Sequence, residues 1–318
     1  MCSIPFSLQL LTSLKIFYNV IASVSLFYNM TCIIVIFARK VHLHSALATH
    51  IIRNQFILDF FVVFNLLIIL NQRFDSGNNA IIDQIVCYLW NSQFPYWTMV
   101  AVSINNLTEN CIDRVCAVRW AIMYKASMKL RFRLYYGLLF TLPILISFPI
   151  IFDTKYINNV CVDRNLNASH HYLIFQKFFA GFWFCCTFII PSAISLFSFF
   201  VIYHVMHNTS KPGGEISIRK SEIRYTVVTF ITDFIFIVSF GVESILYLMK
   251  SFDGICYEKN DPLQHLVVVL GSVSSMINPL VCNMMLKNFR SNWINFWCGC
   301  ISKRYCVAMI RPVTSTTI

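Results

Sequence analysis

The sequence predicts an all-α membrane protein: a bundle of seven transmembrane helices followed by a short amphipathic eighth helix. Of its 318 residues, 57% are hydrophobic and only 12% are charged, whereas soluble domains carry about 25% charged residues. Seven stretches are apolar over about the 20 residues that a helix needs to cross a bilayer. The chain lacks the polar side chains that would cover a water-facing surface, so it is expected to lie in lipid.

The expected spans follow from these apolar stretches. In chain order they are 15–37, 47–70, 85–117, 134–152, 178–204, 225–249 and 263–286. The third is the longest because polar residues interrupt its middle. These residues are Ser103, Asn105, Asn106 and Thr108.

The remaining segments are too short for a second domain. We expect one bundle over residues 15–286, a short extracellular N-terminus over 1–14, and an amphipathic helix with a short cytoplasmic tail over 287–318. The first apolar run is about as long as a full span, longer than the core of a cleavable signal peptide. The first helix is therefore expected to direct its own insertion.

The basic residues indicate how the bundle is oriented. Most of the 25 Lys and Arg residues fall at the cytoplasmic ends of the spans if the N-terminus lies outside. The positive-inside rule therefore predicts a multi-pass plasma-membrane protein with an extracellular N-terminus. The net charge of +11 then indicates contact with anionic lipid headgroups and a cytoplasmic partner rather than with nucleic acid.

One glycosylation sequon agrees with this orientation. Asn167 begins the sequence Asn-Ala-Ser in the outside loop between the fourth and fifth spans. Three other matches, at Asn29, Asn106 and Asn208, fall in spans or in the cytoplasm, where glycosylation does not reach. Asn167 is the expected acceptor.

Asp59 lies near the middle of the second span, where an ionisable residue is costly and indicates function. Polar residues of three other spans could converge on it: Asn29, Ser103, Ser274, Ser275 and Asn278. Such a cluster would hold a small hard cation such as sodium, or would hydrogen-bond a protonated carboxyl. The alternative is a structural polar cluster that ties helices together.

Asp113 and Arg114 stand at the cytoplasmic end of the third span, with Tyr124 in the following loop. This segment resembles the Asp-Arg-Tyr box of rhodopsin-like (class A) G-protein-coupled receptors. Val115 replaces the tyrosine of the box and Ala121 replaces the usual proline. An Asp-Arg pair at a helix end is common, so the resemblance depends on further matches.

Those matches lie in the later spans. Asn278-Pro279 resembles the Asn-Pro box of the seventh helix, and residues 287–290 resemble the start of the family's eighth helix. Pro149 and Pro191 resemble the fourth- and fifth-helix prolines. Residues 236–242 align with the sixth-helix motif, in which Phe240 replaces the tryptophan and Val242 replaces the proline. Cys282 replaces the tyrosine of the Asn-Pro box. Because of these replacements, the chain resembles a divergent member of the family.

The resemblance implies activation of a heterotrimeric G protein on the cytoplasmic side. Arg114 would pair with Asp113 and with Glu222 at the start of the sixth helix, and breaking this pair would let the sixth helix move outward. The residues implied for this switch are Asp113, Arg114, Glu222, Asn278 and Pro279. The alternative is a solvated charge cluster at the membrane edge.

The resemblance also implies a disulfide and a ligand site. Cys87 and Cys161 correspond to the family's disulfide in an oxidising compartment. An unidentified small-molecule or peptide ligand would bind in the outer half of the bundle. The expected ligand residues are Tyr96, Trp97, Phe240, Glu243 and Tyr247. Packing is the alternative role for the aromatic residues.

Two of these residues bear on the class of ligand. The buried carboxylate of Glu243 is costly unless paired, so a cationic ligand group is one partner for it. Tyr96 occupies the position at which amine receptors carry an aspartate, which disfavours a biogenic amine of the usual type.

The stretch after the seventh span carries aromatic residues at helical spacing and can lie in the membrane interface. Cys298 and Cys300 then lie beside Lys303 and Arg304 and are candidates for palmitoylation. The alternative is that they are free, buried cysteines.

Other classes of membrane protein remain as alternatives. A transporter or channel also carries intramembrane carboxylates, but seven spans without an internal repeat disfavour it. An inverted chemoreceptor would place the tail outside, against the charge bias. No His-Glu-x-x-His motif or pair of protease-like aspartates is present, so we predict no enzymatic activity and no cofactor other than a bound sodium ion.

Overall fold

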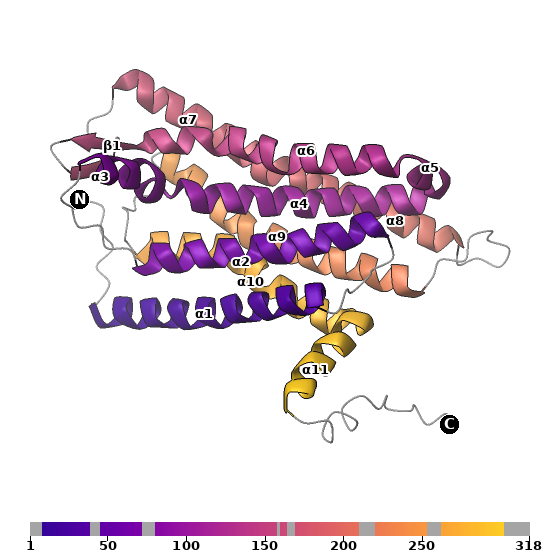
Figure 1. Ribbon diagram of the computed structural model, residues 1–318. Coiled ribbons are helices and arrows are strands. Elements are labelled where there is room, and N and C mark those ends of the chain that lie inside the picture. The colour runs from indigo at the N-terminus through magenta and orange to yellow at the C-terminus, as the bar shows by residue number, and fades with distance from the viewer. Residues whose placement is uncertain are drawn as a thin grey trace.

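The computed structural model describes residues 8–38, 45–71, 80–157, 160–163, 169–209, 220–252 and 262–301. Its long helices run side by side as one bundle, and the last helix leaves the bundle at an angle (Figure 1).

Among the described residues, seven long helical segments form the bundle. They are α1 (Leu8–Ala38), α2 (Ala46–Asn71), α4 (Phe94–Arg119), α6 (Met128–Ser147), α7 (His170–Phe184) continued through the π-helical turn η4 (Cys185–Ile189) into α8 (Ile190–Thr209), α9 (Lys220–Ser251) and α10 (Pro262–Met285). The shorter elements are α3 (Ala80–Val86), η1 (Cys87–Asn91), α5 (Ala121–Ala126), η2 (Phe148–Asp153), β1 (Thr154–Ile157), β2 (Val160–Asp163) and α11 (Lys287–Ile301).

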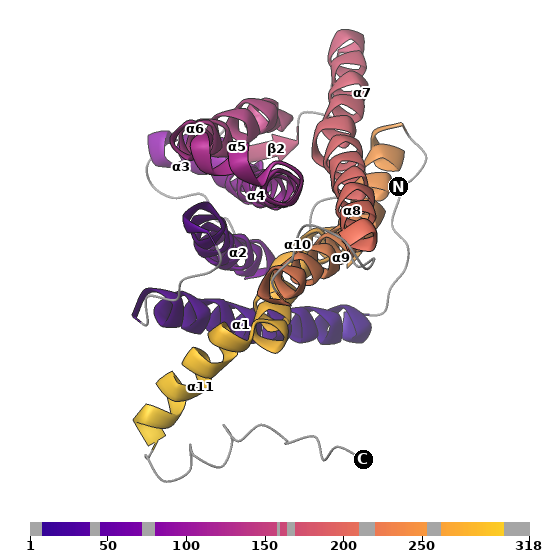
Figure 2. The ribbon, with the colours of Figure 1, turned by 90° about the vertical axis from the view of Figure 1, so that its right-hand side faces the viewer.

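Within the described part of the chain, six of the seven segments are long and apolar enough to cross a membrane. The seventh, α4, carries too many polar side chains to qualify by hydropathy alone. It contacts α2, α6, α8, α9 and α10, and Figure 2 shows it between α6 and α2. Its polar side chains therefore face protein rather than lipid, and the predicted seven-helix bundle is confirmed.

The third span differs from the single helix predicted over 85–117. Gln93 has a left-handed backbone with a φ of 62°, and α4 begins only at Phe94. Pro95 has no N–H to continue a helical ladder from η1, and it lies in the first turn of α4, where that N–H would have no helical partner. The hydroxyl of Ser92 instead accepts a hydrogen bond from the Phe94 N–H at 3.2 Å.

A second proline explains the π-helical turn in the fifth span. Pro191 lacks the N–H that would bond to the carbonyl of Thr187, and η4 ends two residues before Pro191. The hydroxyl of Thr187 turns inward and donates to the carbonyl of Trp183 at 2.8 Å. Pro191 thus widens the helix next to α9.

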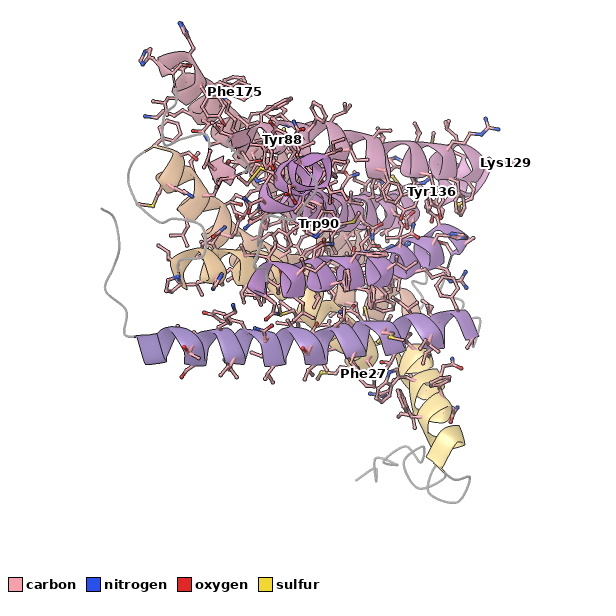
Figure 3. The ribbon with its side chains drawn as sticks, turned by 60° about the vertical axis from the view of Figure 1, so that its left-hand side comes forward. Phe27, Tyr88, Trp90, Lys129, Tyr136 and Phe175 are labelled. Carbon is pink, nitrogen blue, oxygen red and sulfur yellow. A yellow bond between two sulfur atoms is a disulfide. The ribbon has the colours of Figure 1, made fainter. Side chains whose placement is uncertain are left out.

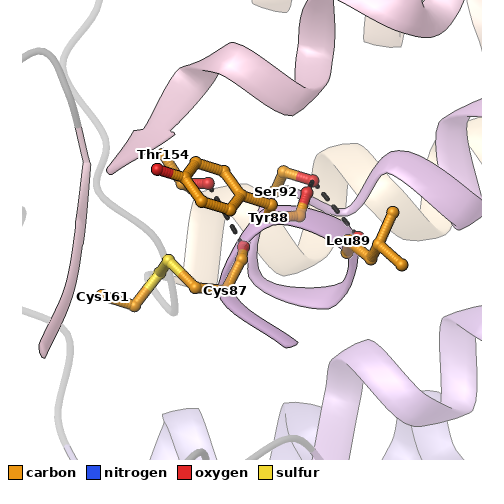
Figure 4. Close-up of a disulfide and its surroundings, with 6 residues drawn as sticks. All are labelled: Cys87, Tyr88, Leu89, Ser92, Thr154 and Cys161. Atoms are coloured by element: carbon orange, nitrogen blue, oxygen red, sulfur yellow. Dashed lines mark hydrogen bonds between the residues drawn. A yellow bond between two sulfur atoms is a disulfide. The ribbon is translucent and has the colours of Figure 1, made fainter. Parts of the chain in front are cut away.

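A β-hairpin that the sequence does not predict covers the end of the bundle beside α3. Strands β1 and β2 are antiparallel, with Tyr156 opposite Cys161. The predicted disulfide between Cys87 and Cys161 is confirmed, with the two Cα atoms 5.5 Å apart, and it joins β2 to η1 (Figure 4). The hydroxyl of Thr154 donates to the Cys87 carbonyl at 3.2 Å. We call this the disulfide end and the opposite end, which carries α5, the Arg114 end.

The amphipathic eighth helix predicted from Lys287 onward corresponds to α11. It packs against α1 through aromatic pairs: Tyr28 lies 5.8 Å from Trp293 and Phe27 lies 6.2 Å from Trp297, between ring centroids. Figure 3 shows Phe27 on the side of α1 that faces α11. Cys298 and Cys300 belong to α11, but their side chains lie outside the described part, as does all of Asn167.

We predict that Gly241→Ala destabilises the bundle. A Cβ atom at Gly241 would lie 2.8 Å from the ring of Phe188, which would force α9 away from η4. Overpacking of this kind costs about 1–3 kcal/mol, so the midpoint of thermal unfolding in mild detergent should fall. Gly137→Ala is the matched control, because nothing lies within 4 Å of its Cβ position; an equal fall for both variants would contradict the prediction.

Candidate functional site

The carboxyl group of Asp59 is fully buried in the middle of the bundle. Its Oδ1 atom accepts hydrogen bonds from Gln55 Nε2 at 2.7 Å and from Ser103 Oγ at 3.1 Å. Its Oδ2 atom accepts one from Asn278 Nδ2 at 3.1 Å, and the side chain of Ser275 lies close to the carboxyl group. Side chains of α2, α4 and α10 therefore meet at Asp59.

The other two residues expected in this cluster lie one step away. The hydroxyl of Ser274 donates to Asn278 Oδ1 at 3.4 Å. The amide of Asn29 donates to the Ser275 carbonyl at 3.2 Å. Both support residues that contact Asp59, and Asn29 extends the cluster to α1.

Gln55 is the member of the cluster that sequence reasoning missed. Its amide Nε2 donates to Asp59 and also, at 2.7 Å, to Ser103 Oγ. Its Oε1 atom accepts from Asn106 Nδ2 at 2.7 Å, which fixes the direction of the amide. Gln55 lies one helical turn before Asp59, and this spacing is the feature of the sequence that could have indicated a contact between the two side chains.

The hydrogen bonds continue from Gln55 toward α6. Asn106 Oδ1 accepts from the hydroxyl of Tyr135 at 2.6 Å, and that hydroxyl accepts from Asn54 Nδ2 at 2.7 Å. Each donor points toward Asp59, so the groups form one directed chain: Asn54, Tyr135, Asn106, Gln55 and Asp59. Such chains are cooperative, because each bond polarises the next.

This arrangement does not suit the expected sodium ion. A hard cation needs six or so oxygen ligands, whereas the amide N–H groups of Gln55 and Asn278 point at the two oxygens of Asp59. The Gln55 N–H group lies between the oxygens of Asp59 and Ser103 that a cation would bridge. The cluster fits a hydrogen-bonded carboxyl that joins helices.

A second polar cluster surrounds Asp113 at the Arg114 end. Asp113 forms an ion pair with Arg114 through Oδ2. Its Oδ1 atom accepts from the hydroxyl of Tyr124 at 2.9 Å and from Arg131 Nη2 at 3.1 Å. Asp113 thus holds α5 and the start of α6 against α4, and it is 1% exposed.

Arg114 also reaches across to α9. Its guanidinium lies 4.4 Å from the ring centroid of Tyr225, a cation–π contact within the protein interior. The hydroxyl of Tyr225 donates to Asn110 Oδ1 at 2.7 Å, and Asn110 Nδ2 donates to Thr229 Oγ1 at 3.1 Å. Two residues of α9 are therefore bonded to two residues of α4.

The residue expected to hold α9 to Arg114 was Glu222. Its backbone lies in α9, one turn before Tyr225, but its side chain is outside the described part of the structure. The pairing of Arg114 with Glu222 stays a prediction. The contact between α9 and Arg114 that the structure describes is made by Tyr225, which the sequence analysis did not select. The only feature of the sequence that could have indicated Tyr225 is its position one turn after Glu222.

The remaining switch residue, Pro279, lies inside α10 directly after Asn278. Because Pro279 lacks an N–H, the carbonyl of Ser275 is freed from the helical ladder. That carbonyl accepts the hydrogen bond from Asn29. Pro279 therefore opens the acceptor that links α10 to α1.

Asp233 bonds α9 to two more helices near the middle of the bundle. Its Oδ2 atom accepts from Ser195 Oγ of α8 at 2.9 Å and from the thiol of Cys111 of α4. The sequence suggested bonding within the bundle without indicating partners. Asp233 is a third polar tie between α9 and its neighbours.

A cavity of about 100 Å³ opens toward the disulfide end of the bundle. Three of the expected ligand residues line it: Trp97, Glu243 and Tyr247. Its further lining comes from α7, η2, α9, α10 and the turn before α4, and includes Trp183, Asp153, Lys250, Gln264 and Gln93.

The other two expected ligand residues do not line this cavity. The hydroxyl of Tyr96 bonds to the Val268 carbonyl at 2.7 Å and to Ser272 Oγ at 2.8 Å, which ties α4 to α10. Phe240 is 1% exposed and packs on Phe236, with 5.3 Å between ring centroids. Both lie in the core, so packing is the role that their surroundings support.

We predict that sodium leaves the thermal stability of the wild-type protein unchanged when it replaces N-methylglucamine in the buffer. In Gln55→Ala, sodium should raise the unfolding midpoint, because the oxygens of Asp59 and Ser103 lose the amide that lies between them. Asn54→Ala is the control, since it breaks the far end of the hydrogen-bond chain without touching Asp59. Stabilisation of the wild type by sodium would contradict this reading.

The comparisons with known proteins agree with this architecture. The family model described as 7 transmembrane receptor (rhodopsin family) matches residues 2–281, which is most of the chain. A comparison with curated proteins finds no match. With a bundle of seven helices that includes the polar α4, the disulfide at one end and Asp113–Arg114 at the other, the chain belongs to the rhodopsin family of seven-transmembrane receptors.

Proposed function

We propose that this receptor binds an extracellular ligand in the cavity at the disulfide end and activates a heterotrimeric G protein at the Arg114 end. The proposal includes a plasma-membrane location with the N-terminus outside, which the distribution of Lys and Arg favours. The observation that carries it is the buried Arg114, held between Asp113 and the Tyr225 ring at the junction of α4 and α9.

The ligand cavity and the Arg114 junction share one rigid element. Helix α9 contributes Glu243 and Tyr247 to the cavity and Tyr225 and Thr229 to the junction. Its 32 residues span about 48 Å at 1.5 Å per residue. A ligand that shifts α9 at one end therefore acts on the contacts of Arg114 at the other.

The contacts that hold α9 at the Arg114 end can be broken without unfolding either helix. They comprise two hydrogen bonds to Asn110 and one cation–π contact to Arg114. When α9 moves and takes Tyr225 away from α4, the side chains of Asn110 and Arg114 become free to contact a G protein that binds at this end. Such a junction has two discrete arrangements, which is the requirement for a switch.

We predict that Tyr225→Ala raises ligand-independent G-protein activation. The substitution removes both the ring that lies against Arg114 and the hydroxyl that bonds to Asn110, so of the three described contacts at this end only the hydrogen bond between Asn110 and Thr229 remains. Nucleotide exchange on a panel of purified G proteins, with the receptor in nanodiscs, measures the effect. Arg114→Ala in the same background should return activation to the level without receptor.

The matched control for this experiment is Tyr203→Ala, an exposed tyrosine near the same end of α8. It should leave nucleotide exchange unchanged. If Tyr225→Ala folds normally and exchange does not rise with any G-protein class, the proposed junction is not the switch.

We also predict that Glu222→Ala raises basal activation, because removal of the expected acid frees Arg114 from a second partner on α9. Combining it with Tyr225→Ala tests whether the two residues act on the same group. If basal activation rises no more in the double variant than in either single variant, the two residues restrain the same group, Arg114. An unchanged basal level in Glu222→Ala would remove Glu222 from the switch.

A further inference from the structure

We propose that the cavity at the disulfide end recognises a cationic group of the ligand, with Glu243 as its counter-charge. The group would be a compact ammonium or guanidinium. This inference rests on the proposed function, in which the cavity holds the ligand, and it adds the chemical class of that ligand.

The surroundings of Glu243 leave half of its carboxyl group unused. Its Oε2 atom accepts a hydrogen bond from the hydroxyl of Ser244 at 3.1 Å. Its Oε1 atom is buried and has no hydrogen-bond partner, although the side chain is only 1% exposed and lines the cavity. An unpaired buried carboxylate is costly, and a cation brought by a ligand would relieve that cost.

Helix α10 lies beside Glu243 where it carries a glycine. A Cβ atom added at Gly271 would be 3.6 Å from the Glu243 Cγ atom and 3.2 Å from the hydroxyl of Tyr96. That hydroxyl bonds to Val268 and Ser272 and gives no hydrogen bond to Glu243 Oε1. The side chain of Glu243 therefore lies next to α10 and lines the cavity with one carboxyl oxygen unpaired.

Two other charged groups line the cavity, Asp153 of η2 and Lys250 of α9. Each has an interaction of its own within the protein. Neither provides a hydrogen bond to Glu243 Oε1. The lining thus contains two acids and one base, and its charge favours a cationic guest.

Aromatic side chains also line the cavity. Trp97 and Trp183 meet edge to face with 6.2 Å between centroids, and Tyr247 lines the same cavity one turn after Glu243. Ring faces attract cations, most strongly when water is excluded. A carboxylate and three aromatic residues around about 100 Å³ match a compact cationic head group rather than a bulky apolar one.

The test is binding of small probes to the purified receptor in detergent, followed by thermal unfolding. The probes are benzylammonium, methylguanidinium and tetramethylammonium chlorides, with benzyl alcohol as the uncharged counterpart of the first, at ionic strength matched with sodium chloride. At least one cation should raise the unfolding midpoint in a saturable way, and benzyl alcohol should not.

Two variants identify the residue responsible. Glu243→Gln keeps the size of the side chain and removes its charge, so the apparent affinity for the stabilising cation should fall by tenfold or more. Asp83→Asn in α3 is the matched control, because Asp83 is an acid outside the lining of the cavity, and it should change affinity by less than threefold. Without a probe, Glu243→Gln should unfold at the wild-type temperature or above it, because it removes an unpaired buried charge.

Several results would overturn the proposal: no saturable stabilisation by any cation, equal stabilisation by benzyl alcohol, affinity that survives in Glu243→Gln, or a lower midpoint for the ligand-free variant. The assay contains no G protein, so its outcome is separate from that of the proposed coupling. A receptor that binds the cation yet activates no G protein would refute the coupling alone. Normal basal coupling without cation binding would refute this inference alone.

Discussion

The structure depends on one constraint: a polar helix in a membrane must satisfy its hydrogen bonds within the protein. Helix α4 carries asparagine, serine, aspartate and arginine side chains along most of its length, and its neighbours supply partners for them. Asn106 bonds to α2 and α6, Asn110 to α9, and Asp113 to the segments that follow α4. The central position of α4 follows directly from this requirement.

The same constraint explains why the polar groups are so specifically arranged. Individual hydrogen bonds in membrane proteins contribute only about 0.6 kcal/mol on average, but an unpaired group in hydrocarbon costs several times more. The partners of Gln55 show the result: both of its amide hydrogens and its oxygen are engaged at 2.7 Å. Any other register of these helices would leave several of these buried groups without partners.

The sequence predicted the features that depend on local composition. Hydropathy located the seven spans, although the first, third and fifth were expected to begin at 15, 85 and 178 and their helices begin at Leu8, Phe94 and His170. The motif resemblance correctly paired Cys87 with Cys161. Where a few residues control the backbone, the prediction was wrong: the span expected over 85–117 is interrupted at Gln93, two residues before Pro95, which has no N–H to continue a helical ladder. The β-hairpin was also missed, since its short strands are stabilised by a disulfide from a distant segment.

Site residues were harder to predict because contacts between helices leave little trace in a single sequence. Asp59, Asp113 and Arg114 were found because a charge in an apolar span is conspicuous. Gln55 and Tyr225 were missed, because an uncharged amide and an aromatic ring have ordinary places in a membrane helix. Of the five expected ligand residues, three point toward the cavity and two point into the core. The position of a residue along a helix does not predict the direction of its side chain accurately enough to separate the two groups.

The directed hydrogen-bond chain that ends at Asp59 has a mechanical consequence. Reversing any one amide would set two donors or two acceptors against each other, so its members must keep their orientation together. The chain unites α2, α4 and α6, and Asn278 and Asn29 extend it to α10 and α1. Helix α9 has no part in it and is held by its own ties to α4 and α8. A movement of α9 would therefore break its bonds to Asn110 and Ser195 and leave the hydrogen bonds around Asp59 intact.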